Sequence, residues 1–150
     1  MLTMYGYELQ TFMLKDPYIK KHYGGVLALD ELPKKKLLQK TVYIVNTDKS
    51  HKKGQHWVLL WIDEQPEYFD SFAQLPPKDI QDTLVKNGSM YLRNTQQIQP
   101  SQSATCGYYC LFYAYYRCRG VKMKDILQKF YYSCLRFNDL KVKMFYNRHK

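Results

Sequence analysis

The spacing of apolar and polar residues along the chain predicts several strands. Thr41 to Asn46 alternates and is rich in β-branched and aromatic residues, which is typical of a strand. His56 to Ile62 is almost continuously apolar, so we expect a central strand buried on both faces. Glu67 to Ser71 is predicted as the next strand, and Ser89 to Asn94 as another. Tyr23 to Val26, which contains two glycines, is predicted as a turn into a short extended piece.

Apolar residues three or four positions apart predict several helices. The first helix, Tyr5 to Lys15, should bury one face and end at Asp16, because the residue before a proline disfavours the helical conformation. Gly88 and Gly120 stand where two later helices should end. The later helices are predicted at Lys78 to Asn87, at Cys106 to Arg119, at Val121 to Tyr132, and as a short last helix within Asn138 to Lys150. The apolar face of the first of these consists of Ile80, Leu84 and Val85.

Strands and helices follow one another without repeats, low-complexity linkers or a domain break. We therefore predict a single domain over residues 1–150, of the α+β class. A mixed central sheet of roughly three to five strands should pack against the helix that begins at Cys106, with further helices around it. Within that helix, a stripe of mostly small residues is expected to lie close to the sheet: Gly107, Leu111, Ala114 and Cys118.

Composition and charge narrow the class of protein. Hydrophobic residues make up 45% and charged residues 24%, which is typical of a globular rather than a disordered chain. Lys and Arg number 23 against 13 acidic residues, so the formal charge is +10. A charge of this sign favours polyanionic partners such as nucleic acid. A basic surface that serves only solubility explains the composition equally well.

The cysteines and the ends of the chain exclude some other classes. Four cysteines lie in the last third of the chain, most of them on one predicted helix, which is not the pattern of a secreted disulfide framework and indicates a reducing compartment. Cys106 and Cys110 have no partner pair at a spacing that would complete a zinc site. Met1 to Gln10 lacks the features of a signal peptide, and the apolar run Trp57 to Ile62 is too short to span a bilayer.

Candidate chemistry centres on Cys106. A thiol at a helix N-terminus faces the positive end of the helix dipole, which favours the nucleophilic thiolate. A histidine, His56, opens one predicted strand, and an acid, Asp70, ends the next. Gln99 precedes the cysteine in the same loop, and its amide together with a backbone N–H could form an oxyanion hole. Nucleophile, base, orienting acid and oxyanion donor are therefore all present.

Each of these residues also has a purely structural interpretation. Most helical cysteines are small core residues, and we expect Cys110 to be one. His56 alone could bond a carbonyl at a strand end, and Asp70 alone could cap a turn. His51 and His149 are predicted to lie at the surface. The motifs taken together favour catalysis over these separate structural roles.

The motifs carry a resemblance to a known family. The order His, acid, Gln, Cys, with Gly-x-His-Trp, Phe-Asp-Ser-Phe and Gln-x6-Cys-Gly, resembles the adenovirus protease (adenain) family, whose clan includes the ubiquitin-like-specific (SUMO) proteases. Ser103 to Cys110 is similar to the adenain nucleophile segment, and the likeness covers roughly Asp16 to Cys118. The papain order does not fit, because here the cysteine comes last. We expect a compact version from a small virus, a virophage or a virus-like transposon.

The resemblance implies an adenain-like cysteine protease fold and a viral cysteine endopeptidase. It implies Cys106 as nucleophile, His56 as base, Asp70 as the acid that orients the base, and Gln99 with the Cys106 N–H as oxyanion hole. Adenovirus enzymes usually carry Glu where Asp70 stands, whereas the ubiquitin-like-specific branch has Asp. The expected substrates are capsid or core precursor proteins, cut after glycine in Gly-containing motifs. Substrate contacts are expected at Trp57, Gly54 and Gly107.

The resemblance also sets expectations about cofactors and partners. The chemistry requires no cofactor, and no metal site is expected. DNA is expected as a sequence-independent partner and as a candidate activator, because adenain uses DNA and the chain is basic. Adenain relatives in mammalian viruses tether an activating peptide through a cysteine upstream of the Gln, but Met90 to Ile98 and the predicted helix before it contain none. We expect a monomer without membrane association, located in the virion and the host cell interior and not secreted.

Two alternative functions stay open at this point. The first is a deubiquitinating or deSUMOylating protease of the same clan, which differs only in its substrate. The second is a basic nucleic-acid-binding protein with a decayed active site. The presence of Cys106, His56, Asp70 and Gln99 argues against decay.

Overall fold

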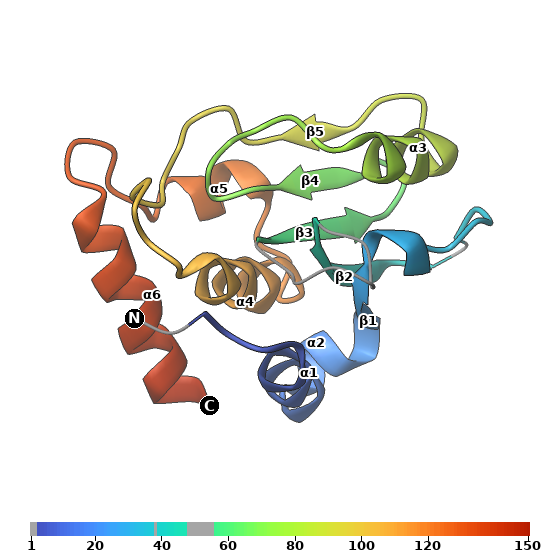
Figure 1. The fold of residues 1–150 in the computed structure, drawn as a ribbon. Helices are drawn as coiled ribbons and strands as arrows, with labels where there is room; N and C mark the ends of the chain where they lie inside the picture. The colour runs from blue at the N-terminus through green and yellow to red at the C-terminus, as the bar shows by residue number, and fades with distance from the viewer. Residues whose placement is uncertain (1–2, 38, 48–55) are drawn as a thin grey trace.

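A five-stranded mixed sheet with the order β1-β2-β3-β4-β5 forms the centre of the protein (Figure 1). The computed structural model describes residues 3–37, 39–47 and 56–150. The outer pairs β1–β2 and β4–β5 are parallel, and the inner pairs β2–β3 and β3–β4 are antiparallel. The strands are β1 (Tyr23–Ala28), β2 (Thr41–Asn46), β3 (Trp57–Ile62), β4 (Glu67–Phe69) and β5 (Leu92–Arg93).

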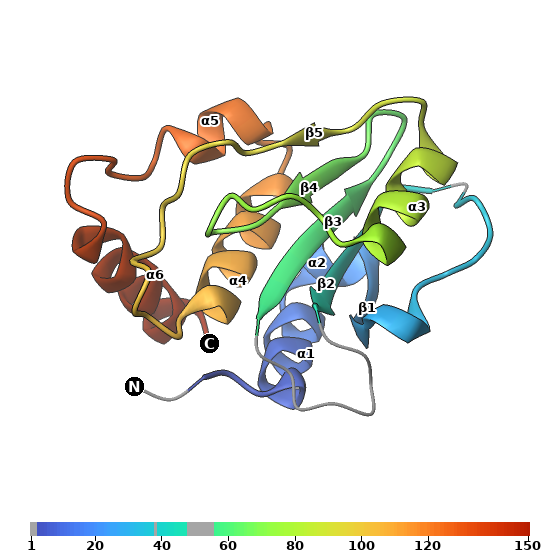
Figure 2. The ribbon, with the colours of Figure 1, turned by 45° about the horizontal axis from the view of Figure 1, so that its top comes forward.

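Helices cover both faces of the sheet (Figure 2). One face packs against α4 (Cys106–Arg117), with α1 (Gly6–Lys15) and α2 (Pro17–His22) beside it, while α6 (Arg136–His149) flanks α4. The other face carries the 3-10 turn η1 (Leu29–Glu31) and α3 (Lys78–Asn87). The short helix α5 (Met123–Leu127) follows α4. None of the helices in the described residues is both long enough and apolar enough to cross a bilayer.

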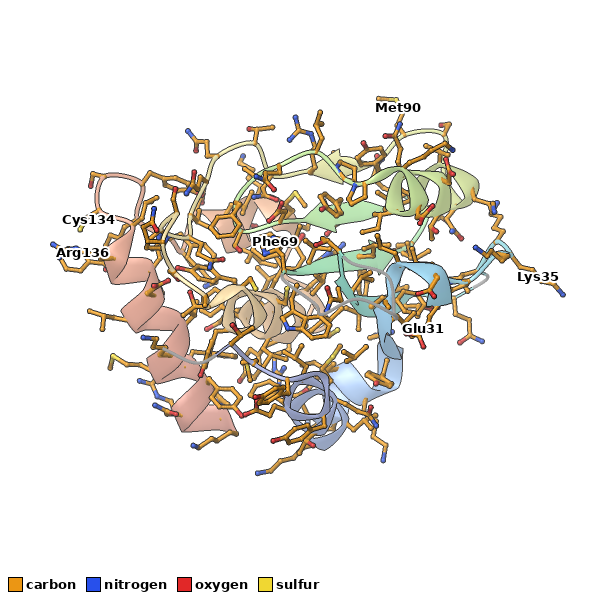
Figure 3. The ribbon with its side chains drawn as sticks, viewed as in Figure 1. Glu31, Lys35, Phe69, Met90, Cys134 and Arg136 are labelled. Atoms are coloured by element: carbon orange, nitrogen blue, oxygen red, sulfur yellow. The ribbon has the colours of Figure 1, made fainter. Side chains whose placement is uncertain are left out.

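The central strand β3 separates two apolar cores. Leu59 and Trp61 point into the core on the α4 side, whereas Val58, Leu60 and Ile62 point into the core on the α3 side. Successive side chains of a strand alternate between faces, so a nearly continuous apolar run can serve both cores. The prediction of a central strand buried on both faces is therefore confirmed. Figure 3 shows side chains filling the space between the layers around Phe69, whereas Lys35 and Arg136 lie at the periphery.

Several element boundaries agree with the sequence-based predictions. β2 and α3 occupy the predicted residues, α1 begins one residue later, and the sheet has five strands. The expected α+β fold, with a mixed sheet packed on the helix of Cys106, is confirmed. The last helix, α6, begins at Arg136 and continues to His149, so it is longer than predicted. β5 is confined to Leu92–Arg93, shorter than the predicted strand.

Near the N-terminus, the predicted end of the first helix at Asp16 is confirmed, but the helix that follows was not predicted and the predicted turn was wrong. Asp16 ends α1, but its carboxylate also accepts hydrogen bonds from the N–H groups of Tyr18 and Ile19 and so caps a second helix, α2. A proline is well accommodated at the first position of a helix, where its missing N–H would have no partner. The residues predicted as a turn lie within β1 instead. Gly24 is a glycine because strand β1 approaches Tyr43 closely there, and a Cβ would come 2.4 Å from its ring.

Other predictions about buried faces also need correction. Val85 of α3 is 47% exposed, and the predicted helix from Val121 to Tyr132 contains only α5. In α4 the residues that contact the sheet include Cys106 and Tyr113, since Cys106 lies beside the first residue of β3 and the ring of Tyr113 stacks on Phe69. Gly107, the first residue of the predicted stripe, faces Met4 and Leu9 and not the sheet. α4 is buried nearly all round, so apolar periodicity cannot identify its sheet-facing side.

Candidate active site

The register of two antiparallel strands brings the predicted base and acid together. His56 directly precedes β3 and Asp70 directly follows β4, with Leu59 paired to Phe69 between them. The start of one strand and the end of its antiparallel neighbour lie at the same edge. The Nε2 atom of His56 lies 2.6 Å from Oδ1 of Asp70. The structure therefore forms the histidine–carboxylate pair that the sequence predicted.

Asp70 is buried and held from several directions. Its carboxylate accepts hydrogen bonds from the backbone N–H of Phe72 at 2.9 Å and of Gln74 at 3.2 Å. Its own backbone N–H donates to Oδ1 of Asn94, and the Asn94 amide donates to the Asp70 carbonyl at 2.6 Å. Asn94 was not predicted as a site residue, although a polar residue at the end of a predicted strand was a signal for it. These bonds fix the carboxylate opposite the imidazole ring.

Cys106 is the first residue of α4 and lies at the same edge of the sheet. Its Sγ accepts a hydrogen bond from the backbone N–H of Trp57 at 3.3 Å, and the side chain is only 2% exposed. The thiol also lies close enough to the imidazole of His56 to interact with it. A backbone donor and the N-terminus of α4 both stabilise negative charge on the sulfur.

The environment of His56 favours the protonated ring. Burial lowers the pKa of His56, but its interactions with Asp70 and Cys106 outweigh this and raise the pKa from 6.5 to about 9. The ring also stacks on Phe72, with the centroids 4.9 Å apart. No atom among the described residues makes a regular hydrogen bond with the second ring nitrogen, Nδ1. This nitrogen is therefore available for the proton that passes to and from the thiol.

The side chain of Gln99 is fully buried in the loop before α4. Its Oε1 accepts a hydrogen bond from the hydroxyl of Ser71 at 2.5 Å, and its Nε2 donates to the carbonyl and hydroxyl oxygens of Ser103 at 2.9 and 3.2 Å. The amide nitrogen thus points toward the segment that leads to Cys106. The nitrogen already makes two hydrogen bonds to Ser103, so we expect donation to a substrate oxyanion to replace one of them.

The three predicted substrate contacts have different positions. The backbone of Trp57 lies at Cys106, while its indole N–H donates to the carbonyl of Met4 at 3.0 Å. Gly107 is buried against Met4 and Leu9, because a Cβ there would come within 3.1–3.3 Å of them. Gly54 lies outside the described residues.

The remaining cysteines differ from Cys106 in their surroundings. Cys110, one turn further along α4, is buried, and burial raises the pKa of its thiol well above its usual value. Burial likewise raises the pKa of Cys118 to about 12. All four cysteines are free thiols. The core position expected for Cys110 is confirmed, and it leaves Cys106 as the thiol next to a base.

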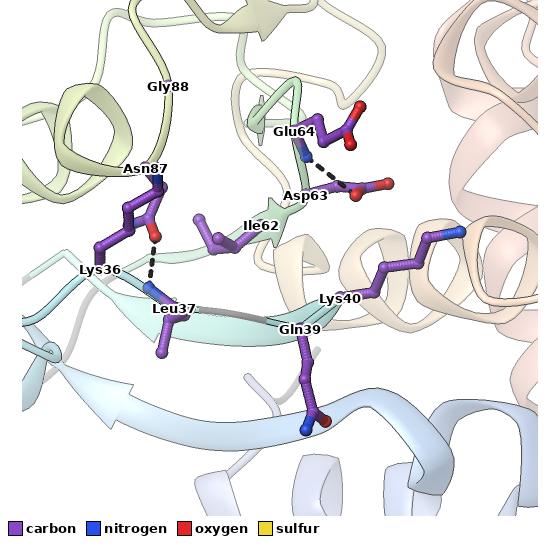
Figure 4. A pocket seen from close by; sticks show the side chains of 9 residues that line it. All are labelled: Lys36, Leu37, Gln39, Lys40, Ile62, Asp63, Glu64, Asn87 and Gly88. Carbon is purple, nitrogen blue, oxygen red and sulfur yellow. Dashed lines mark hydrogen bonds between the residues drawn. The ribbon is translucent and has the colours of Figure 1, made fainter.

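Two hollows lie at opposite ends of β3. A hollow of about 380 Å³ borders His56 and Asp70, and its other lining residues are Thr47, Tyr68, Phe72, Gln74, Leu75 and Pro77. A larger one, of about 550 Å³, lies around Ile62 at the far end of the strand (Figure 4). Its lining residues are Lys36, Leu37, Gln39, Lys40, Ile62, Asp63, Glu64, Asn87 and Gly88. Only the first hollow adjoins the candidate site.

The described residues contain no group of three or more His, Cys, Asp or Glu side chains that could hold a metal ion. The chemistry supported by the geometry is that of a thiol, an imidazole and a carboxylate. A thiolate beside an imidazolium, which is oriented by a buried carboxylate, can attack a carbonyl carbon and return a proton to the leaving group. This is the chemistry of acyl transfer.

Comparison with known proteins places the fold. No family profile and no curated protein sequence matches the chain. The crystal structure of the ASFV pS273R protease superposes with a TM-score of 0.60 at 18% identity, covering 83% of this chain and 60% of that one. This chain therefore spans less than two thirds of the length of that protease.

Two structures of the SUMO protease Ulp1 are also similar. One, with its catalytic cysteine oxidised to a sulfinic acid, has a TM-score of 0.51 at 20% identity. The match covers 85% of this chain and 73% of the Ulp1 chain. The other is the C-terminal Ulp1 protease domain in complex with Smt3, the yeast ortholog of SUMO, with a TM-score of 0.51 at 19% identity, covering 81% and 68%. The chain thus has the fold of these proteases, and the expected structural likeness to the SUMO protease clan is confirmed.

Proposed function

We propose that this protein is a cysteine protease in which Cys106 is the nucleophile, His56 the general base and acid, and Asp70 the residue that orients His56. The observation that supports this most strongly is the 2.6 Å contact of His56 with buried Asp70, beside a thiol that accepts a hydrogen bond from Trp57 N–H. Gln99 and the Cys106 N–H are the proposed oxyanion hole. The fold shared with the ASFV and Ulp1 proteases supports the same reaction class.

The proposed reaction has two half-reactions. The Cys106 sulfur attacks the scissile carbonyl, and the oxyanion accepts hydrogen bonds from the Cys106 N–H and from one N–H of Gln99 released from Ser103. His56 then gives its proton to the leaving amine, which departs and leaves a thioester. A water molecule gives a proton to His56 and attacks the thioester, the carbon–sulfur bond breaks, and the acid is released with Cys106 restored.

The proposed substrates are viral capsid or core precursor proteins cut after glycine. The chain superposes on the ASFV pS273R protease with a higher TM-score than on Ulp1, 0.60 against 0.51. This supports a viral precursor protein as the substrate. The preference for glycine rests on the resemblance to adenain relatives, whose clan threads the residues before the cut through a narrow channel floored by the Trp after the histidine, here Trp57. A residue without Cβ passes such a channel most easily. The backbone N–H of Trp57 lies at the nucleophile, which supports this placement. Removal of a ubiquitin-like protein is the second candidate, because one similar structure holds Ulp1 in complex with Smt3.

One experiment separates the two candidates. The protein and its Cys106→Ala variant are incubated with precursor proteins from the same genome, and new N-termini are sequenced. In parallel, both are treated with ubiquitin-like proteins that carry a C-terminal vinyl sulfone. New termini after glycine, only with the unmodified protein, support precursor cleavage. Labelling of Cys106 by the ubiquitin-like probe without precursor cleavage supports the second candidate. If there is no precursor cleavage and no labelling, both candidates are rejected.

We also propose that DNA is a sequence-independent partner. The support is the net charge of +10 and the basic residues of α6. If about five phosphates are contacted, log K should fall with log salt with a slope of about −4 to −5. Fluorescence anisotropy of a labelled random duplex between roughly 20 and 200 mM salt measures this, with peptide cleavage assayed in parallel. Absence of binding at the lowest salt would contradict the proposal, and binding without a change in cleavage would remove DNA as an activator.

A further inference from the structure

Asp139, an acidic residue on the otherwise basic helix α6, is 9% exposed and faces the loop that leads to the nucleophile. Its Oδ1 accepts two hydrogen bonds, from the hydroxyl of Thr105 at 2.8 Å and from that of Tyr109 at 2.7 Å. Thr105 directly precedes Cys106 and is itself fully buried. The carboxylate on α6 is therefore one hydrogen bond from the residue that precedes the nucleophile helix. Asp139 takes no direct part in the proposed reaction.

A chain of hydrogen bonds continues from Thr105 to Gln99. The Thr105 hydroxyl bonds to the hydroxyl of Ser103, which in turn accepts from Nε2 of Gln99 at 3.2 Å. The far end of the Gln99 amide, Oε1, accepts from Ser71. We call the series Asp139, Thr105, Ser103 and Gln99 the Asp139 relay. It links a helix near the C-terminal end of the chain to the proposed oxyanion donor.

The charge of Asp139 fixes the direction of every bond in the relay. A carboxylate accepts hydrogen bonds and cannot donate them, so the single hydroxyl proton of Thr105 points to Asp139. Thr105 can then only accept from Ser103, whose own proton is used in that bond. Ser103 offers Gln99 only lone pairs, so the amide must present its nitrogen and not its oxygen to this side.

The second bond of Asp139 has a fixed direction as well. Burial and the nearby Asp139 raise the pKa of the Tyr109 hydroxyl, so it keeps its proton and remains a donor. Tyr109 lies on α4 and is not part of the relay. It therefore supplies a control, because its hydroxyl can be removed while the bond from Thr105 to Asp139 remains.

We infer that Asp139 is a positioning residue for the reaction, acting through Thr105 and Ser103 to keep the Gln99 amide nitrogen directed toward the nucleophile segment. This inference rests on the proposed cysteine protease function and on the oxyanion role of Gln99. Without the carboxylate, Thr105 can donate to Ser103 and Ser103 can donate to Gln99. The Ser103 carbonyl and Ser71 then remain as the groups that hold the amide in this orientation, so it rotates to present its oxygen more easily. An oxygen turned toward a developing oxyanion repels it.

The test compares Asp139→Asn and Thr105→Val with Tyr109→Phe. For each variant, kcat and KM are measured separately with a cleavable peptide, together with the rate at which iodoacetamide alkylates Cys106. Alkylation needs the thiolate but develops no oxyanion. We expect Asp139→Asn and Thr105→Val to lower kcat by about 10- to 100-fold, less than complete loss of an oxyanion donor, with KM and the alkylation rate nearly unchanged. Tyr109→Phe should leave kcat within about threefold, because the relay is intact.

A double substitution shows whether Asp139 acts through Gln99. In a Gln99→Ala background, Asp139→Asn should cause no further loss of kcat, because the group it positions is absent. Equal losses in both backgrounds, or parallel losses of kcat and alkylation rate, would overturn the inference and make Asp139 a structural residue only. If Asp139→Asn does not fold, Thr105→Val decides by the same criteria. An unmodified protein that cleaves no peptide would reject the proposed function, and the inference with it, whereas an active protein unaffected by these substitutions would reject the inference alone.

Discussion

The two polar groups that flank Cys106 are built in different ways. The His56–Asp70 pair is one direct contact of 2.6 Å between the ends of adjacent antiparallel strands. The Asp139 relay reaches Gln99 through two hydroxyl side chains and joins a loop to α6. Strand register brings His56 and Asp70 to the same end of the sheet, whereas the neutral amide of Gln99 lies in a loop and is oriented by a network with a charge at one end. Catalysis should therefore be sensitive to loss of either member of the His56–Asp70 pair. In the Asp139 relay, it should be sensitive to any change that lets the hydrogen bonds reverse their direction.

The largest effect is expected from His56→Ala. The substitution removes both the base that activates Cys106 and the acid that protonates the leaving amine, so kcat should fall by about 10⁴-fold or more. Steady-state cleavage of a peptide after glycine measures this, with His149→Ala as the control because that residue lies at the end of α6. Comparable losses from both substitutions would mean that His56 has no special role.

A smaller loss with a distinct pH dependence is expected from Asp70→Asn. The variant should lose roughly 10³- to 10⁴-fold in kcat, because the ring is no longer held in one tautomer. The unmodified protein should lose activity as pH rises through about 9, where the His56 imidazolium loses its proton. Without the Asp70 charge and hydrogen bond, this alkaline limb should move down toward 6.5. An alkaline limb that does not move would contradict the assignment of Asp70.

The same pKa makes a prediction about stability. Because the folded-state pKa of His56 is raised from 6.5 to about 9, protonation stabilises the folded protein fully below pH 6.5, and this contribution is lost as pH rises through 9. Chemical denaturation at intervals across this range should show a decline that is smaller in Asp70→Asn. A decline of the same size in the variant would assign the effect to other groups.

Loss of the oxyanion donor should cost less than loss of the pair. Gln99→Ala is expected to lower kcat by roughly 10²- to 10³-fold, the usual cost of one such donor, with little change in the alkylation rate of Cys106. Gln97→Ala is a suitable control, since its amide donates to the Gln99 carbonyl and to Ser101 in the same loop. A loss of less than about threefold would mean that Gln99 serves the loop and not the reaction.

The smallest effect tests how the acid itself is held. Asn94→Ala leaves the backbone N–H and carbonyl of Asp70 without their buried partner, which should cost about 1–3 kcal/mol of stability and lower kcat through displacement of Asp70. Asn87→Ala is the matched control, because it also removes a buried asparagine, one that accepts from Leu37 N–H far from the site. If the two substitutions lower kcat to a similar extent, Asn94 has no specific role in holding Asp70.

The sequence predicted the parts of the fold and site that depend on local patterns. Alternation located β2, apolar content identified β3 as central, and the order of His56, Asp70 and Cys106 indicated the pair and the nucleophile. Gly24 of β1 was misread because its requirement, close packing on Tyr43, is a contact between strands. Such contacts leave no local signal in one sequence.

The oxyanion side of the site was predicted only in part. Gln99 was identified from its spacing to Cys106, but its bonds to Ser71 and Ser103 depend on how a loop folds. Asp139 was not identified at all, because an acid on a basic helix resembles a solvent-exposed residue. One signal was present, since Asp139 falls three positions before the buried Val142 and hence on the apolar side of α6.

The most direct test of the account asks which thiol carries the acyl group. Cleavage of a glycine-containing peptide is measured for the unmodified protein, Cys106→Ala and Cys110→Ala, and a peptide vinyl sulfone is used to trap the reactive thiol for mass spectrometry. We expect Cys106→Ala to be folded but inactive and unlabelled. Cys110→Ala should remain active, since burial raises the pKa of the Cys110 thiol well above its usual value. Normal turnover by Cys106→Ala together with an inactive Cys110→Ala would contradict the account.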